Sequence, residues 1–223
     1  PSGAACSRGK SVLECSHSYF QHGRLLTTVY QILPEKKRQF SVNSDRAPAR
    51  RAGNRRERTG GGGLLYVTGD THGDLERFRG REARQLKRGD TLVVCGDFGF
   101  VWDGSPQEQK RLDWLGSRKY EVLFLDGTHD NLDRLAAYPQ EPLHGGLARR
   151  VAGNCWYLGR GEVYEAQGVR FFALGGGESR DLDTRTPGET WWPQELPSPQ
   201  ELDRAWENLQ AGGNRVDCIF THE

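Results

Sequence analysis

The sequence lacks methionine altogether, including at position 1. Because a primary translation product begins with methionine, we expect the printed chain to be a fragment. The sequence also lacks any apolar run that approaches the ~20 residues needed to cross a bilayer. Near the N-terminus the longest candidate, residues 25–33, is interrupted by threonine and glutamine, which argues against a secretory signal. These absences predict a soluble protein without a membrane partner.

Cysteine is present but sparse. The five cysteines are an odd number, and none of them stand in C-x-x-C spacing. Cys95 and Cys218 lie inside apolar, strand-like runs, where a thiol usually acts as a small core residue. This usage gives no support for a disulfide framework and predicts a reducing, cytoplasmic location.

Charge is unevenly distributed along the 223 residues, although the formal net charge is only +1. Residues 1–63 hold 12 Lys and Arg against 4 Asp and Glu, a net +8, and residues 64–223 hold the other 19 against 26, a net −7. The chain has room for one well-buried domain and an appendage. We therefore predict a basic extension over residues 1–63 and a domain over residues 64–223.

The basic extension shows no sustained helical or strand periodicity. Arginine dominates residues 47–58, and residues 60–63 are four consecutive glycines. We interpret the extension as a disordered, solvated tail. Two alternatives stay open. One is an arm that binds nucleic acid, although it lacks interleaved aromatic residues. The other is sequence translated from upstream of the native start, where a G-rich ribosome-binding site would encode glycines.

From residue 64 onward, strand-like and helix-like segments alternate, and a hairpin follows, which predicts an α/β domain with mixed sheets. The expected strands cover residues 64–67, 91–95, 121–126, 155–158, 162–166, 169–174 and 216–220. The expected helices cover residues 75–87, 106–119, 131–138 and 199–211. Residues 167–168 are expected to form a hairpin turn, and residues 175–192 a long irregular loop.

Side chains of the kinds that bind metals follow four of the expected strands. They are Asp70 and His72 after the first strand, Asp97 after the second, His129 and Asp130 after the third, and His222 after the last. A lone histidine after a strand is more often a hydrogen-bonded residue, and aspartate after glycine is common in turns. Sites in α/β proteins gather at the carboxyl ends of strands, however, so the recurrence predicts one shared site. Mixed carboxylate and imidazole ligands suit Mn, Fe or Zn, and a carboxylate that bridges two ions about 3.5–4 Å apart can help them clamp a phosphoryl group.

The segments GDTHGD, GDFGF, GTHD and THE resemble successive motifs of the bacterial-type calcineurin-like metallophosphoesterases, namely D-x-H, G-D-x-x, G-N-H-D/E and a single H. The resemblance covers residues 64–223 and implies a four-layer sandwich of two mixed β-sheets flanked by helices. It also implies a hydrolase that cleaves phosphomonoester or phosphodiester bonds of a phosphorylated substrate. In this family two divalent metal ions act together, and a hydroxide that bridges them attacks phosphorus directly.

The resemblance assigns a role to each ligand-type residue. Asp70 and His72 would hold the first metal, Asp97 would bridge both, His222 would hold the second, and His129 would protonate the leaving group. Two departures bear on the second metal: Thr128 stands where the pattern has Asn, and the final G-H-x-H segment is missing. We therefore expect this fragment to hold one ion well and the second poorly. A catalytically impaired scaffold or binding protein is the alternative, because a Thr hydroxyl is a poorer ligand than an amide oxygen.

The loop over residues 175–192 is the expected determinant of substrate choice. Arg185 could pair with a phosphate oxygen, and the three glycines at 175–177 could bring backbone close to phosphate. Trp191 and Trp192 could stack on a base or an aryl group. In the alternative interpretation the tryptophans pack in the core or a lid, and the glycines only form a turn.

Overall fold

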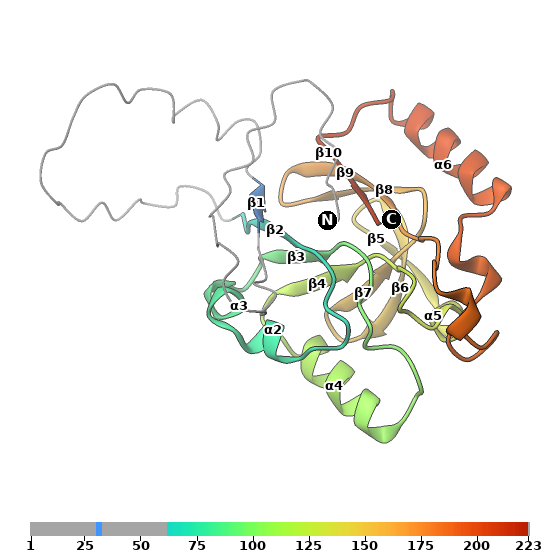
Figure 1. The fold of residues 1–223 in the computed structure, drawn as a ribbon. Coiled ribbons are helices and arrows are strands. Elements are labelled where there is room, and N and C mark those ends of the chain that lie inside the picture. Colours follow the sequence, from blue (N-terminus) through green and yellow to red (C-terminus); the bar gives the residue numbers. More distant parts are fainter. Residues whose placement is uncertain (1–29, 33–61, 223) are drawn as a thin grey trace, which may run out of the picture.

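The computed structural model describes residues 30–32 and 62–222, whose strands form two sheets (Figure 1). The seven-stranded sheet has the order β1-β2-β3-β4-β7-β6-β5, and the three-stranded sheet has the order β10-β9-β8. The strands of the larger sheet are β1 (Tyr30–Ile32), β2 (Leu65–Thr68), β3 (Thr91–Val94), β4 (Glu121–Phe124), β5 (Gln140–Leu143), β6 (Gly146–Ala152) and β7 (Cys155–Leu158). Those of the smaller sheet are β8 (Glu162–Ala166), β9 (Val169–Leu174) and β10 (Cys218–Thr221).

Both sheets are mixed, as the sequence predicts. In the larger sheet β2, β3, β4 and β7 run parallel, whereas β1 with β2, β6 with β7, and β5 with β6 are antiparallel pairs. In the smaller sheet β9 is parallel to β10 and antiparallel to β8. The parallel strands matter most for function, because their carboxyl ends meet at one edge of the larger sheet.

Short helices connect the strands. They are α2 (Glu76–Arg79), α3 (Arg81–Gln85), α4 (Pro106–Gly116), α5 (Leu132–Ala137) and α6 (Pro199–Ala211), with 3-10 helices η1 (Leu182–Thr184) and η2 (Pro193–Glu195). Helix α4 packs against β4, β6 and β7 of the larger sheet, and α6 packs against β8 of the smaller one (Figure 1). No helix in the described part of the chain is long and apolar enough to span a bilayer.

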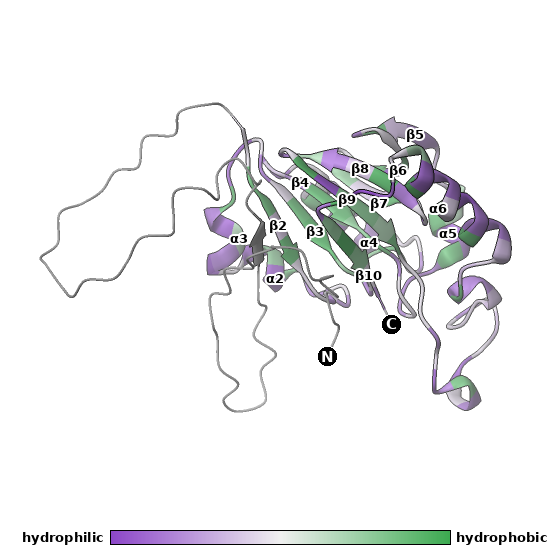
Figure 2. Cartoon of the chain, turned by 90° about the horizontal axis from the view of Figure 1, so that it is seen from above, coloured by the Kyte–Doolittle hydropathy of each residue, from purple (hydrophilic) through white to green (hydrophobic). Residues whose placement is uncertain are grey.

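Two apolar clusters form the core, one between the sheets and one between the larger sheet and its helices. Alternate side chains of a strand point to opposite faces, so Leu92 and Val94 of β3 join the helix-side cluster while Val93 joins the cluster between the sheets. Every residue of β3 is buried, as expected for a central parallel strand. The central strands in Figure 2 are mainly hydrophobic, whereas α3 and α6 carry many hydrophilic residues.

The two longest helices begin with the expected capping residues. The Ser105 hydroxyl accepts a hydrogen bond from the Glu108 backbone N–H at the start of α4. Ser198 and Glu201 form a reciprocal capping box at the start of α6. Proline occupies the first turn of both helices, where its missing N–H costs no hydrogen bond.

Three details differ from the sequence-based expectation. The predicted helix over residues 75–87 is two short helices, because Gly80 between them is extended (φ −62°, ψ 171°) and interrupts the helical hydrogen bonds. An unpredicted hairpin, β5–β6, turns at His144 and Gly145, both of which have positive φ. Strand β1 lies within the predicted disordered extension, at residues 30–32. The predicted disorder of residues 1–29 and 33–61 falls outside the described residues.

Candidate metal centre

Four chain segments bring carboxylate and imidazole groups to the carboxyl edge of the parallel strands. Asp70 and His72 follow β2, Asp97 follows β3, His129 follows β4, and His222 follows β10 of the second sheet. The register of β2, β3 and β4 aligns their last residues, Thr68, Val94 and Phe124, side by side. The turns that follow these residues therefore begin at the same level, and the side chains they carry can meet.

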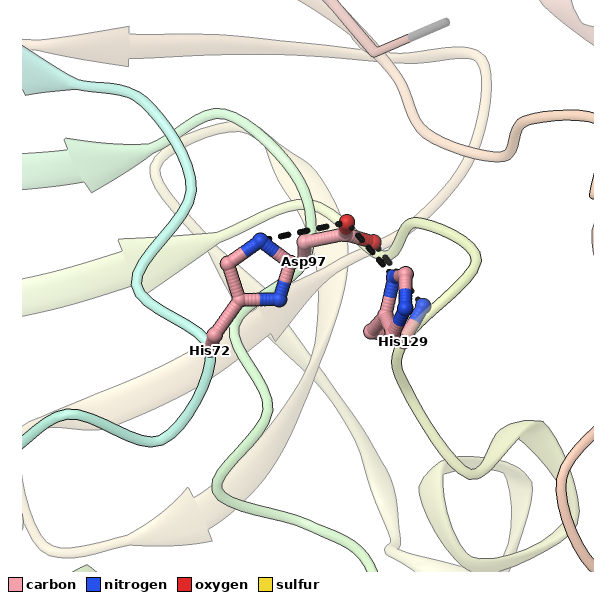
Figure 3. Close-up of side chains that lie close together, drawn as sticks. All are labelled: His72, Asp97 and His129. Atoms are coloured by element: carbon pink, nitrogen blue, oxygen red, sulfur yellow. Dashed lines mark hydrogen bonds and ion pairs between the residues drawn. The ribbon is translucent and has the colours of Figure 1, made fainter. Parts of the chain in front are cut away.

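Asp97 lies at the centre of this group. Its Oδ2 atom is 2.9 Å from His129 Nδ1 and 3.7 Å from His72 Nε2, and its Oδ1 atom is 3.4 Å from His222 Nε2. Figure 3 shows the Asp97 carboxylate between the rings of His72 and His129, which come from different loops. The Asp97 side chain is only 6% exposed, whereas those of His72 and His129 are about half exposed. The group is thus open to a ligand from the histidine side.

Asp70 adds a second carboxylate to the group. Its Oδ2 atom is 3.7 Å from His72 Nε2, and its Oδ1 atom is 3.8 Å from His222 Nδ1. Among the described residues, Asp70 Oδ1 is buried and has no hydrogen-bond partner. A buried carboxylate oxygen without a partner is costly, and a cation held between two carboxylates and two imidazoles would compensate it. The residues present therefore fit a divalent metal.

The orientation of His222 also suits metal binding. Its Nδ1 atom lies 3.1 Å from the Cys95 carbonyl oxygen, so Nδ1–H donates there and Nε2 faces Asp97, where it can bind a metal once it has lost its proton. A hydrogen bond from the other ring nitrogen to a carbonyl is the usual way in which a metal-binding imidazole is oriented.

Two glycines make room for these side chains. A Cβ atom at Gly96 would lie 2.1 Å from Cγ of the His222 ring, and a Cβ at Gly127 would lie 2.2 Å from Asp97 Oδ1. The backbone itself is unusual at two of the site residues, since His72 and Asp97 have φ values of 46° and 45°. Positive φ in residues other than glycine is uncommon and clusters at functional sites.

The charges of the group perturb one another. Burial raises the pKa of Asp97, but hydrogen bonds from His129 and His222 outweigh burial and hold it well below the ordinary value. Burial lowers the pKa of His222, but the hydrogen bond to Asp97 and its negative charge raise it to about 8. The hydrogen bond to Asp97 also raises the pKa of His129. The raised pKa values favour the positively charged forms of His129 and His222, and a metal would replace this charge.

Asp130, which the sequence groups with the candidate ligands, binds backbone N–H groups instead. Its carboxylate accepts hydrogen bonds from the backbone N–H groups of Phe98 (3.2 Å), Gly99 (2.8 Å) and Gly127 (3.0 Å). Burial raises its pKa to about 7. Asp130 joins the turn that carries Asp97 to the turn that carries His129, a role that the local motif did not indicate.

Thr128, the predicted doubtful ligand, is buried beside His129. Its hydroxyl lies 3.2 Å from His129 Nδ1, and its carbonyl accepts a hydrogen bond from Arg185. The nearby Asn131 caps α5 by accepting from the Arg134 N–H, and its amide donates to the Trp102 carbonyl. The Asn131 side-chain amide is therefore occupied by its own helix and by the segment that follows β3.

Arg185 reaches the site from the long loop before η2. Its guanidinium donates to the carbonyls of Thr128 (2.7 Å) and Thr190 (3.0 Å), and Nη2 lies 3.4 Å from His129 Nε2. The Arg185 side chain is 8% exposed and is also paired with Asp181 at 2.8 Å. It is thus a well-held cation beside the exposed nitrogen of His129.

The tryptophan pair of this loop does not offer a joint stacking surface. Trp192 is 1% exposed, donates its indole N–H to Asp133 at 2.9 Å and packs edge-on against Trp102. It is a core residue, in agreement with the packing interpretation of the sequence.

A positioning contact from α2 was missed. Arg77 donates to the Asp70 carbonyl, and the backbone N–H of His72 donates to the Asp97 carbonyl at 2.9 Å. Together these contacts hold the first and second turns against each other. No local sequence signal marks Arg77, because its partner is a backbone atom.

Comparison with protein-family models gives a match over most of the described chain. The family model for the calcineurin-like phosphoesterases matches residues 64–223. No curated protein and no solved structure matches the chain. The matched range begins just before β2 and includes each of the five residues that converge at the sheet edge.

Proposed function

The chain belongs to the calcineurin-like phosphoesterase family, and on this premise we propose that it hydrolyses phosphomonoester or phosphodiester bonds with two divalent metal ions. Members of the family are typically hydrolases of phosphoric esters. One observation carries the proposal: two carboxylates and three imidazoles from four segments meet at one edge, and a buried oxygen of Asp70 lacks a partner there.

We assign the metal ligands from this donor set. Asp70 and His72 would hold the first ion, His222 the second, and Asp97 both, since its two oxygens face different imidazoles. The mixture of nitrogen and oxygen donors favours Mn, Fe or Zn over Ca or Mg. When bound, such ions polarise a phosphoryl group and lower the pKa of water from 15.7 to roughly 7.

His129 is the proposed general acid. Its Nδ1–H donates to Asp97 at 2.9 Å, which fixes the ring and leaves Nε2 on the exposed side. The hydrogen bond to Asp97 raises the pKa of His129, which favours the protonated ring. Nε2 would then deliver this proton to the oxygen of the leaving group.

Arg185 is the proposed phosphate-binding residue. Its guanidinium lies 3.4 Å from His129 Nε2, so a phosphoryl oxygen placed for protonation of the leaving group would also lie within reach of this cation. Charge-assisted hydrogen bonds from arginine suit phosphate oxygens in geometry and strength. The Thr128 and Thr190 carbonyls hold the guanidinium in advance of binding.

The test is hydrolysis of bis-nitrophenyl phosphate and nitrophenyl phosphate by the metal-free chain after addition of Mn²⁺. We expect activity that depends on Mn²⁺ and is lost in D97N. The control variant H144Q should retain activity, because His144 also pairs with a carboxylate but lies at the turn between β5 and β6. Binding of two Mn²⁺ ions per chain without any hydrolysis would contradict the proposal. That result would favour the scaffold alternative, which is motivated by Thr128 at the position where the family pattern has Asn.

A further inference from the structure

A buried ion pair outside the metal-ligand group joins the turn between β7 and β8 to the segment that follows β4. Arg160, in the turn between β7 and β8, donates from Nε to Asp126 Oδ2 at 3.0 Å, and Nη2 donates to the same carboxylate. The side chains of Arg160 and Asp126 are 5% and 0% exposed. The Tyr157 hydroxyl donates to Asp126 Oδ1 at 2.9 Å. Because desolvation offsets much of the attraction in such a pair, stability alone is a weak explanation for it.

Asp126 connects this ion pair to the proposed catalytic turn. It follows β4 and precedes Gly127, Thr128 and His129 directly in the chain. Its backbone carbonyl accepts a hydrogen bond from the Gly176 N–H at 3.0 Å. A Cβ atom at position 175 would lie 2.2 Å from Asp126 Oδ1, so the close approach of this segment depends on glycine at 175. One end of the segment is thus held against Asp126.

Arg160 holds the other end of the same segment. Nη1 donates to the Gln194 carbonyl at 2.8 Å, and Nη2 lies 3.2 Å from the Glu195 carbonyl, to which it donates. The Gly177 N–H donates to the Glu195 carbonyl at 3.1 Å and closes the ends upon each other. We call residues 175–195 the clamp loop, since both of its ends meet at one ion pair. Arg185 lies within it.

We propose that Arg160 is a positioning residue that, together with Asp126, fixes the ends of the clamp loop and thereby holds Arg185 beside His129. This inference rests on the proposed function of the site, because it concerns how phosphate is bound there. Arg160 itself contacts loop carbonyls and the Asp126 carboxylate. Its effect on catalysis would therefore pass through Arg185 or through the turn that carries His129, which Asp126 precedes.

A double-mutant cycle tests this dependence. In the full chain with saturating Mn²⁺, R185Q should lower kcat/KM for bis-nitrophenyl phosphate by about 10- to 100-fold, chiefly through KM. R160K keeps the charge but loses the forked geometry, and it should lower kcat/KM by about 5-fold or more. In the R185Q background, R160K should change kcat/KM by less than about 2-fold, because the loop then has no phosphate ligand to position. Equal losses in both backgrounds would overturn the inference.

A matched control separates loop positioning from a general loss of stability. The Arg150 guanidinium is also held by defined contacts, but away from the clamp loop. It lies 4.8 Å from the centre of the Trp156 ring, and its Nε–H donates to the Gly153 carbonyl. R150K should therefore leave KM unchanged. If R160K folds poorly, G175A provides a second variant, because its new methyl group would push the loop from Asp126 without removing a charge. G175A should raise KM as R160K does, and an unchanged KM in G175A would contradict the inference.

Amide hydrogen exchange gives a readout that does not need activity. R160K should accelerate exchange across residues 175–195 by about 10-fold relative to R150K, since the hydrogen bonds at the loop ends weaken. Unchanged protection of this loop in R160K would overturn the inference even if kinetics changed. Absence of hydrolysis by the unaltered protein would instead overturn the proposed function. The exchange measurement would still show whether Arg160 fixes the ends of the clamp loop.

Discussion

Two histidine–carboxylate pairs lie at different places on the larger sheet. His129 pairs with Asp97 at 2.9 Å where β3 and β4 end, and His144 pairs with Glu121 at 2.7 Å where β4 begins. In both pairs the hydrogen bond to the carboxylate raises the pKa of the histidine. Distance and pKa therefore do not distinguish a functional pair from a structural one.

The surroundings of the two pairs do distinguish them. Asp97 has two further imidazoles within 4 Å, those of His72 and His222. Glu121 accepts one additional hydrogen bond, from the Thr91 hydroxyl at 3.3 Å. The comparison teaches that convergence of several chain segments, rather than one short contact, marks the site. Matched substitutions at the two pairs should therefore have very different consequences.

The largest difference is expected at the carboxylates. D97N removes the negative charge shared by the proposed metal ligands and should lower Mn²⁺-dependent kcat/KM by about 10³-fold or more. E121Q should change it by less than about 2-fold, because Glu121 touches no other candidate ligand among the described residues. Steady-state kinetics and calorimetric titration with Mn²⁺ measure both effects. Comparable losses in the two variants would remove the distinction.

The histidines should differ by substrate. H129A should lower kcat by about 10²–10⁴-fold for an alkyl phosphodiester with a poor leaving group, and much less for a nitrophenyl ester, which needs little proton donation. H144A should leave both rates near those of the unaltered protein. Equal losses on the two substrates in H129A would exclude His129 as the general acid.

Metal affinity should depend on pH through His222. Its pKa of about 8 in the metal-free protein means that a bound proton must leave before the ring can act as a ligand. Affinity for Mn²⁺ should therefore fall by about tenfold per pH unit below pH 8. In H222Q the slope of log affinity against pH should decrease by about one, because one fewer proton is released when Mn²⁺ binds. An affinity that stays constant between pH 6 and 8 would contradict this assignment.

The smallest expected effect concerns the stability that the His144–Glu121 pair contributes. The pKa of His144 is raised on folding, so its contribution is fully present below the unfolded value of about 6.5 and is lost as pH rises through the folded pKa. The unfolding free energy of the unaltered protein should exceed that of H144Q by up to about 1 kcal/mol at pH 6, and by less at pH 9. Denaturant unfolding at the two pH values measures this difference. A larger gap at pH 9 would show that the pair acts in another way.

Much of the site could be predicted because its residues follow strands. Asp70, Asp97 and His129 each come directly after a run of apolar, β-prone residues, and parallel strands bring their carboxyl ends together. His222 follows the same pattern, although β10 belongs to the second sheet. The two mixed sheets likewise follow from alternating helices and strands and a later hairpin.

Other features left little or no local pattern in the sequence. The Arg160–Asp126 pair joins residues 34 positions apart, and Arg77 contacts a backbone carbonyl, so neither contact leaves a motif in the sequence. The break at Gly80 depended on one residue in an otherwise helical pattern. The β5–β6 hairpin did have a signal, since a two-residue turn with positive φ at both positions favours glycine, here Gly145.

A substitution at Gly96 should abolish the proposed hydrolysis without removing any of the proposed ligands or the general acid. A methyl group at this position would lie 2.1 Å from both Cγ and Nδ1 of His222, so G96A must displace that imidazole. The outer surface and all carboxylates and histidines would be retained. The G96A variant would therefore separate the cellular effects of phosphoester hydrolysis from effects that need only the folded protein.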